Sequence, residues 1–109
     1  MYKLTTPTLT FTFPENFDMS VLTPTNTYVT FSTQNMKEIV TKTANSIEIV
    51  GHSVKVFLNQ EETQTFPSGG IKAQINWAFT EGGVTKRACT NVMEINVKDN
   101  LYKEIIGAS

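Results

Sequence analysis

The stretch LNQEETQTFPSG, residues 58–69, places two carboxylates side by side among amides and hydroxyls. Paired carboxylates can act as general acid and base when both reach the same substrate atom. Glu61 and Glu62 are adjacent, however, and adjacent side chains on a helix point about 100° apart because one turn holds about 3.6 residues. The two groups do not converge, so the spacing argues against catalysis by this pair.

The same stretch has the pattern of a short capped helix. Asn59 precedes Glu62 by three residues, so its side chain can accept a hydrogen bond from the backbone N–H near Glu62. Carboxylates early in a helix also suit the positive end of its dipole. Pro67 and the glycines after Ser68 then end the helix. We predict a short helical crossover between strands, with Phe66 packed beneath the sheets.

His52 and Cys89 are the one histidine and the one cysteine of the chain. A Cys–His dyad can act as a nucleophile and its base, but neither residue has neighbours in sequence that suggest activation. We expect a small buried thiol and a histidine in a turn. One His and one Cys cannot build the usual zinc sets, and the glycine pairs at 69–70 and 82–83 match no phosphate-binding motif. The sequence therefore predicts no enzyme, no cofactor and no metal site; a hydrolase would need converging carboxylates or an activated Cys89.

Aromatic residues offer a second kind of site, a platform for carbohydrate. The platform would require five rings to be exposed together: Tyr28, Phe31, Phe57, Trp77 and Phe79. Inward-facing aromatics at alternating positions of a small β-protein more often belong to the core. Tyr2 and Tyr102, near the ends of the sequence, are better suited to contact with a partner.

Composition limits the remaining classes of function. The 109 residues are expected to form one domain, 1–109, with 39% hydrophobic and 17% charged residues. The nine Lys and Arg residues are scattered and the formal net charge is −1, which argues against nucleic-acid binding. The sequence shows neither the apolar core of a signal peptide nor a run of transmembrane length. We expect no membrane insertion, and synthesis in a cytoplasm, where a lone cysteine stays reduced.

Alternation of apolar and polar residues predicts the strands that must carry any site. The candidates are residues 8–13, 27–33, 36–43, 47–50, 54–58, 71–79 and 84–97. The clearest is 71–79, where the odd-numbered residues from Ile71 to Phe79 are apolar while Lys72, Gln74 and Asn76 are polar.

Several details of these strands stay open in the sequence. The break at Gly51 is either a bulge or a hairpin, and we favour the hairpin. Gly82 and Gly83 predict a hairpin turn, and the long segment 84–97 suggests a bulge at 89–91. The tail, 100–106, fits either a helical turn or a final strand.

Short strands separated by frequent turns predict an all-β fold. We expect an antiparallel immunoglobulin-like β-sandwich of about seven strands with one short helical crossover.

The run VKVFLNQEETQTFPSGGIKAQINWAFTEGG, followed by NVMEINVKDNL, resembles small tail proteins of phages and prophages of Gram-positive bacteria. Their shared pattern is L-x-Q-E-E-T-x-x-F, a glycine, a strand with a Q-I core and a closing V-x-V-x-x-x-L. The residues that match are Leu58, Gln60, Glu61, Glu62, Thr63, Phe66, Gly70, Gln74, Ile75, Ile95, Val97 and Leu101. We interpret the matching residues from Leu58 to Gln74, together with Asn59 and Trp77, as a structural signature. Its ten residues are Leu58, Asn59, Gln60, Glu61, Glu62, Thr63, Phe66, Gly70, Gln74 and Trp77.

The resemblance implies a β-sandwich that acts in a tail or baseplate, and a related domain anchors some baseplate upper proteins by their N-terminus. It implies no catalytic residues. Expected partners are other tail or baseplate proteins, including copies of the chain itself, and the expected location is the virion tail, after synthesis in the host bacterial cytoplasm. Segments 86–91 and 34–46 depart from the family pattern. The alternative hypothesis is a module that binds carbohydrate or another component of the host surface.

Overall fold

The computed structural model describes residues 1–107, and that part of the chain folds into eight strands arranged in two antiparallel sheets. The strands are β1 (Thr8–Thr12), β2 (Thr27–Ser32), β3 (Glu38–Thr43), β4 (Ile47–Val50), β5 (Ser53–Phe57), β6 (Ile71–Glu81), β7 (Val84–Cys89) and β8 (Met93–Ile95). The helix α1 (Gln60–Gln64) and three short 3-10 turns, η1 (Met19–Val21), η2 (Pro24–Asn26) and η3 (Ala44–Ser46), connect them. The predicted all-β sandwich with one short helical crossover is confirmed.

The first sheet has the strand order β1-β5-β4, and the second has the order β3-β2-β6-β7, with β8 also paired to β6. In a constant-type immunoglobulin domain the second strand lies in the same sheet as the first, fourth and fifth. Here β2 instead lies between β3 and β6. The likeness to immunoglobulin domains therefore concerns the two packed layers, and the strand order is different.

The core lies between the two layers and is built by the predicted alternation. On β6, Ile71, Ala73, Ile75 and Trp77 are buried while the residues between them are partly exposed. Across the sheet, β2 contributes Val29 and Phe31, and β5 of the other sheet contributes Val54 and Val56. The period of two that marks a half-buried strand thus identified the inward faces correctly.

Segment 84–97 forms two strands because Thr90 interrupts the ladder. The Thr90 hydroxyl accepts a hydrogen bond from the Ile75 N–H at 3.1 Å, and the Thr90 N–H donates to the Ile75 carbonyl at 2.9 Å. β7 pairs with one end of β6 and β8 with the other. The irregularity predicted at 89–91 is confirmed, and it accounts for eight strands instead of about seven.

Two hairpins also follow the sequence. β4 and β5 pair antiparallel across Gly51, as we favoured. At the β6–β7 turn, Gly82 and Gly83 have φ of 60° and 77°, backbone angles that side chains disfavour and that tight hairpin turns require.

The tail contradicts both predictions, since residues 100–106 contain neither a helix nor a strand. Local side-chain hydrogen bonds replace regular structure there. Asn100 accepts from the Tyr102 N–H at 3.2 Å through its side-chain oxygen and donates to the Lys3 carbonyl at 3.2 Å. The tail is therefore held against the N-terminal segment without joining a sheet.

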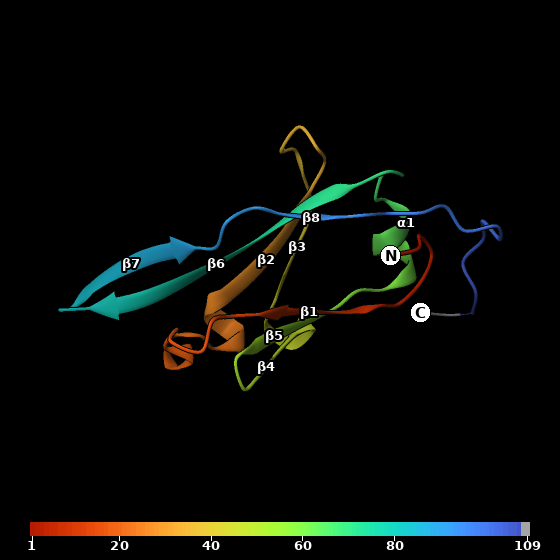
Figure 1. Cartoon of the computed structure of the whole chain (residues 1–109). Helices are drawn as coiled ribbons and strands as arrows, with labels where there is room; N and C mark the ends of the chain where they lie inside the picture. The colour runs from red at the N-terminus through yellow and green to blue at the C-terminus, as the bar shows by residue number, and fades with distance from the viewer. Residues whose placement is uncertain (108–109) are drawn as a thin grey trace.

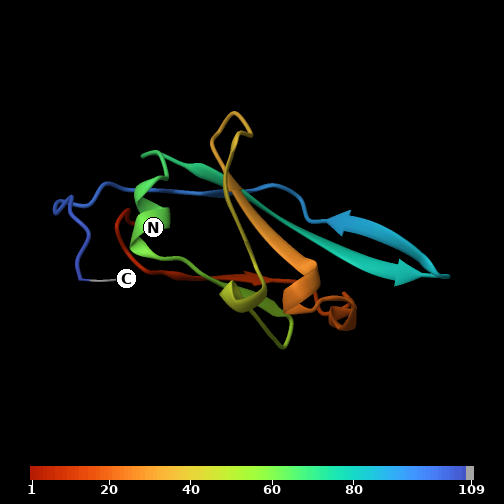
Figure 2. The same ribbon diagram turned by 180° about the vertical axis from the view of Figure 1, so that it is seen from behind.

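The molecule is elongated, with extents of 51 × 29 × 24 Å. The β6–β7 hairpin projects at one end, whereas α1, the N-terminus and the last described residues, 100–107, lie at the opposite end (Figures 1 and 2). The two ends of the long axis thus present different structures to a neighbour.

Candidate functional site

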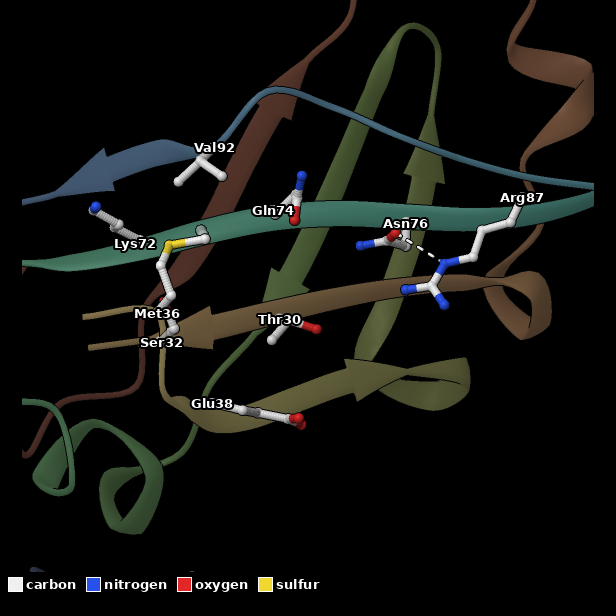
Figure 3. A pocket seen from close by; sticks show the side chains of 10 residues that line it. Thr30, Ser32, Met36, Glu38, Lys72, Gln74, Asn76, Arg87 and Val92 are labelled. Carbon is white, nitrogen blue, oxygen red and sulfur yellow. Dashed lines mark hydrogen bonds between the residues drawn. The ribbon is translucent and has the colours of Figure 1, made fainter. Parts of the chain in front are cut away.

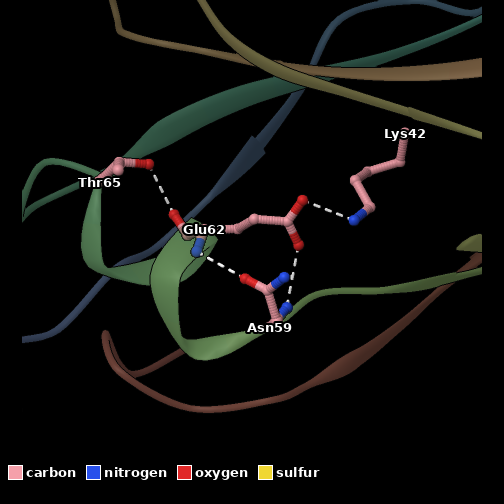
Figure 4. Close-up of polar contacts among 4 residues, drawn as sticks. All are labelled: Lys42, Asn59, Glu62 and Thr65. Carbon is pink, nitrogen blue, oxygen red and sulfur yellow. Dashed lines mark hydrogen bonds and ion pairs between the residues drawn. The ribbon is translucent and has the colours of Figure 1, made fainter. Parts of the chain in front are cut away.

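The crossover helix α1 is capped as its sequence predicts (Figure 4). The Asn59 side chain accepts from the Glu62 N–H at 2.8 Å, and a Glu62 carboxylate oxygen accepts from the Asn59 N–H at 2.9 Å. This reciprocal arrangement is a capping box. The predicted helix N-terminus is confirmed.

Glu62 has a second contact that fixes its carboxylate. Its other oxygen lies 2.5 Å from the Lys42 ammonium of β3, and both side chains are largely shielded from solvent. The carboxylate thus completes the cap with one oxygen and ties α1 to the five-stranded sheet with the other. Such use of both oxygens supports a structural role for Glu62 in place of the acid–base role that the paired carboxylates first suggest.

Three further signature residues, Leu58, Thr63 and Phe66, anchor the crossover through their buried side chains. Leu58 and Phe66 are buried in the core, and Thr63 has no exposed surface. The Thr63 hydroxyl donates to the Thr5 carbonyl at 2.9 Å and accepts from the Thr5 N–H at 3.1 Å. Because a buried hydroxyl must have hydrogen-bond partners, this pair fixes the N-terminal segment to α1.

The remaining signature residues have distinct positions. Gly70 leaves space for Gln34, whose amide nitrogen would lie 2.7 Å from a Cβ added at position 70. Gln74 points to the outer face of β6 and donates to the Thr90 carbonyl at 2.9 Å. Trp77 points inward from the same strand. The signature therefore describes packing and connections, with no cluster around one reacting atom.

Gln60 holds the C-terminal segment, residues 100–106, against α1 because its side-chain amide pairs with the Ile106 backbone as a neighbouring strand would. Its amide nitrogen donates to the Ile106 carbonyl at 2.8 Å, and its amide oxygen accepts from the Ile106 N–H at 2.9 Å. This gives Gln60, one of the signature residues, a role as a clamp.

Replacing Gln60 by alanine is expected to release the tail while changing global stability by less than about 1 kcal/mol, because both bonds are exposed to solvent. Hydrogen exchange should show faster exchange at the Ile106 amide, with the core strands unchanged. Gln64→Ala, on the same helix, serves as the control. Equal exchange at Ile106 in both variants would contradict the clamp.

Ser68 makes a contact with Asp99 that should appear in a pH titration. The Ser68 hydroxyl donates to the Asp99 carboxylate at 2.5 Å, and this bond, helped by Lys103 and Lys3, lowers the pKa of Asp99 below its ordinary 3.8. A carboxyl with a lowered folded pKa stabilises the fold above its unfolded pKa and loses that contribution as pH falls through the folded pKa.

Ser68→Ala should therefore raise the Asp99 pKa toward 3.8 and reduce the acid sensitivity of folding below that pH. NMR titration of the Asp99 carboxyl carbon measures the shift directly. A titration curve identical to that of the unmodified protein would show that the bond does not form in solution.

Cys89 corrects one expectation, since its thiol is exposed instead of buried. It lies at the end of β7, an edge strand that no further strand covers. Its sulfur lies 3.4 Å from the Gln74 amide nitrogen. His52 lies exposed in the β4–β5 turn, as expected. No hydrogen bond joins His52 to Cys89 in the described part of the chain, and the two belong to different sheets.

Residues 1–107 contain neither a metal-binding cluster nor a membrane-spanning helix. No group of three or more His, Cys, Asp or Glu side chains there is placed to hold a metal ion. Within the same residues, no helix has the length and apolar character needed to cross a bilayer.

The core position that we favoured for the inward-facing aromatics is confirmed for Trp77 and Phe31, so the platform of five exposed rings does not form. Trp77 and Phe31 are buried, with exposures of 6% and 0%. Trp77 packs edge-on against Phe13 and Phe17, with ring centroids 6.0 and 5.4 Å away. A flat site that includes Trp77 is therefore excluded, although the Tyr28 ring remains exposed on β2.

β7, the outer strand of the β6–β7 hairpin, is the most exposed strand of the described chain. β2 pairs with β6 only as far as Trp77, so the part of the hairpin beyond it, residues 78–87, has two strands; we call it the arm. Nearly all of β7 is exposed, including Val84 at the tip. An apolar hollow of about 210 Å³ lies at the base of the arm, lined in part by Phe17, Val21 and Phe79.

A group of exposed apolar side chains lies at the opposite end of the molecule. We call it the terminal patch, and it consists of Tyr2, Leu101, Tyr102 and Ile106. Leu101 is fully exposed, which is unusual for a large apolar residue fixed between hydrogen-bonded neighbours. Exposed apolar side chains mark a contact site when they form one contiguous patch, whereas single ones are common on any surface.

Comparison with known proteins adds no relative: no family model, no curated protein and no solved structure matches this chain.

Proposed function

We propose that this chain is a non-catalytic structural module of a phage or prophage tail or baseplate, acting through protein–protein contacts. The resemblance of residues 54–101 to small tail proteins supports the tail context. The structural roles of Asn59, Glu62, Thr63 and Phe66 support the interpretation of that pattern as a fold signature. The module would be made in the host bacterial cytoplasm and would reside in the virion tail.

The observation that carries the proposal is the arm. An isolated two-stranded hairpin is at best marginally stable in water, and a third strand or a packed surface stabilises it. Beyond Trp77, β6 has β7 on one edge, and the exposed faces of the arm have no covering layer. A neighbouring tail protein that packs on the arm would supply that missing layer.

The arm also carries charges that limit indiscriminate pairing. Lys86 forms an exposed ion pair with Glu81 at 2.8 Å, and Arg87 follows it on β7. Charged residues on an edge strand discourage random edge-to-edge aggregation. The arm is therefore suited to a specific partner with a complementary surface.

The terminal patch supplies a second contact at the far end of the long axis. Two different contact surfaces at opposite ends favour a head-to-tail arrangement, which closes into a ring when the rotation between copies permits it. Partners in this scheme are other tail or baseplate proteins, including copies of this chain.

Light scattering at micromolar concentration, combined with affinity capture of proteins encoded by adjacent genes, tests the proposal. We expect either a defined oligomer or specific capture of a neighbouring gene product. A protein that remains monomeric and captures none of these products would contradict it.

A further inference from the structure

β1 is an edge strand: it pairs antiparallel with β5 on one side and with no described strand on the other. Two backbone hydrogen bonds continue this ladder beyond its ends. One runs from the Phe13 N–H to the His52 carbonyl at 2.7 Å, and the other from the Leu58 N–H to the Pro7 carbonyl at 3.2 Å. Hydrogen-bonded pairs alternate with non-hydrogen-bonded pairs along an antiparallel ladder. The odd-numbered residues of β1 therefore direct their backbone groups to β5.

The even-numbered residues of β1 direct their backbone N–H and C=O groups to the open side. These residues are Thr8, Thr10 and Thr12, and their backbone forms no hydrogen bond on that side within residues 1–107. Their side chains are exposed, whereas Leu9 and Phe11 are half-buried against the core. The open side of β1 thus presents a row of backbone donors and acceptors at the spacing that a further strand requires.

β1 differs from the other edge strands of the described chain because it carries no charge. Exposed edges promote aggregation, and natural proteins usually protect them with charged residues, proline or a bulge. The other edge strands, β3, β4, β7 and β8, are protected in this way by Glu38 and Lys42, Glu48, Lys86 and Arg87, and Glu94 respectively. The segment TLTFT contains neither a charge nor a proline. A strand that covers β1 in the assembled protein would explain this unprotected edge.

A hollow of about 420 Å³ lies beside β1 and is lined by both sheets. The first sheet has three strands and the second has five, so the second has inner surface that the first does not cover. Phe11 lines the hollow from β1, and Ile75 of β6 and Met93 of β8 line it from the second sheet. The remaining lining residues are also uncharged: Thr10, Thr12, Phe13, Pro14, Thr90 and Asn91.

The hollow on the outer face of the five-stranded sheet has a different character (Figure 3). Its lining combines Glu38 with Lys72 and Arg87, so it carries charges of both signs. β2 and β6 beneath it are paired on both sides and have no free backbone. These features do not favour one class of ligand. The β1 edge, in contrast, combines free backbone with an uncharged lining, and both restrict what can bind.

We propose that the open side of β1 binds an extended, uncharged segment of a partner protein, which joins the first sheet as a fourth strand. Its backbone would pair with Thr8, Thr10 and Thr12, because another extended backbone matches a row of donors and acceptors at strand spacing. Every second side chain would enter the hollow beside Phe11 and Met93. Apolar residues suit these positions, since a charged group there would lose its hydration without gaining a partner.

A separate segment fits this site better than a second copy of the chain. A second copy paired through its own β1 would bring its β8 against that of the first, because β8 lies beside β1 in each copy. The site also extends the set of contacts proposed above, since neither the arm nor the terminal patch supplies a lining residue.

NMR titration of the whole chain with a synthetic peptide tests the proposal. The peptide repeats the uncharged alternation of β1 itself, TLTFTF, with lysines added outside this sequence for solubility. We expect the amide signals of Thr8, Thr10 and Thr12 to shift. Amide exchange at Thr10 should slow about fivefold at saturation, as expected for one new backbone hydrogen bond. A comparison peptide with lysine at the second and fourth positions should not bind.

Thr10→Pro removes an N–H that the added strand needs. Proline is tolerated on an edge strand where the N–H faces solvent, so this variant should fold and bind the peptide about tenfold more weakly. Thr10→Val keeps the N–H and should bind unchanged. Met93→Lys places a charge in the hollow and should also weaken binding, whereas Met36→Lys, at an exposed methionine away from the hollow, should not. Thermal unfolding confirms that each variant is folded, and the Met93 pair completes the test if Thr10→Pro is not.

Three results would overturn the assignment: no shift at the three threonines with millimolar peptide, equal binding of both peptides, or equal binding by each variant and its control. Shifts of the same amides that grow with protein concentration in the absence of peptide would overturn it in favour of a second copy. Oligomerisation through the arm requires none of these outcomes, so the assembly proposal and this one can fail separately.

Discussion

Replacing Phe66 by alanine should lower the free energy of unfolding by about 3–5 kcal/mol. Phe66 has no exposed surface, and its ring centroid lies 5.6 Å from that of Phe31 on β2. Truncation removes this contact and leaves a cavity beneath α1, where the capped helix, fixed to β3 by the Glu62–Lys42 ion pair, cannot move inward freely. Urea unfolding followed by Trp77 fluorescence measures the loss, since the chain has one tryptophan.

Phe57→Ala is the matched control for this experiment. Phe57 lies at the end of β5 and is 40% exposed, so its truncation should cost clearly less, on the order of 1 kcal/mol. If both variants lost the same stability, Phe66 would not be the anchor of the crossover, and the structural interpretation of the signature would be wrong.

Replacing Trp77 by alanine should have an effect of similar size, about 3–5 kcal/mol. Trp77 packs against Phe13 and Phe17, which bring the connection between β1 and β2 onto the sheet. It also occupies the last position at which β6 is paired on both edges. Its loss should therefore loosen both that connection and the base of the arm.

Circular dichroism must follow unfolding of this variant, because it lacks the fluorescent probe. Hydrogen exchange should show faster exchange in the arm, residues 78–87, than in β1 or β5. Trp77→Phe keeps an aromatic ring in contact with Phe13 and should recover a large part of the stability. Wild-type stability in Trp77→Ala would contradict the burial of this residue and reopen the aromatic platform.

The features that the sequence predicted well are local. Alternation identified the inward faces of β2 and β6, and the spacing of Asn59 and Glu62 identified the capping box. Gly82 and Gly83 identified a hairpin turn, since few other residues tolerate its backbone angles. Each of these signals depends on residues within a few positions of one another, so no knowledge of tertiary contacts is needed.

The features that were missed depend on strand pairing. Nothing in the TYVTFS segment indicates that β2 lies between β3 and β6. Alternation with a period of two shows which side chains share a face of the sheet, but it does not show which strands lie alongside. Cys89 was expected to be buried because a strand was expected to be covered. The structure places it on the uncovered edge strand β7.

The candidate sites share this limitation. Phe11, Ile75 and Met93 are separate apolar positions in the sequence, and only the packing of the two sheets brings them together beside the open edge of β1. The arm could not be predicted from the sequence either, because it begins where β2 stops pairing with β6, at Trp77, and that position depends on the strand register. The exposed Tyr2 and Tyr102 were the one surface signal that the sequence offered in advance.

The most direct test of the assembly proposal is the affinity between this chain and the partner identified by light scattering or capture, measured for three variants. Val84→Lys places a positive charge at the arm tip opposite Glu81, and Leu101→Asp places a negative charge in the terminal patch. Val50→Lys changes an exposed valine on β4, away from both surfaces. We expect Val84→Lys or Leu101→Asp to weaken binding about tenfold or more, with Val50→Lys unchanged. Equal affinity in all three variants would contradict assembly through the arm and the terminal patch.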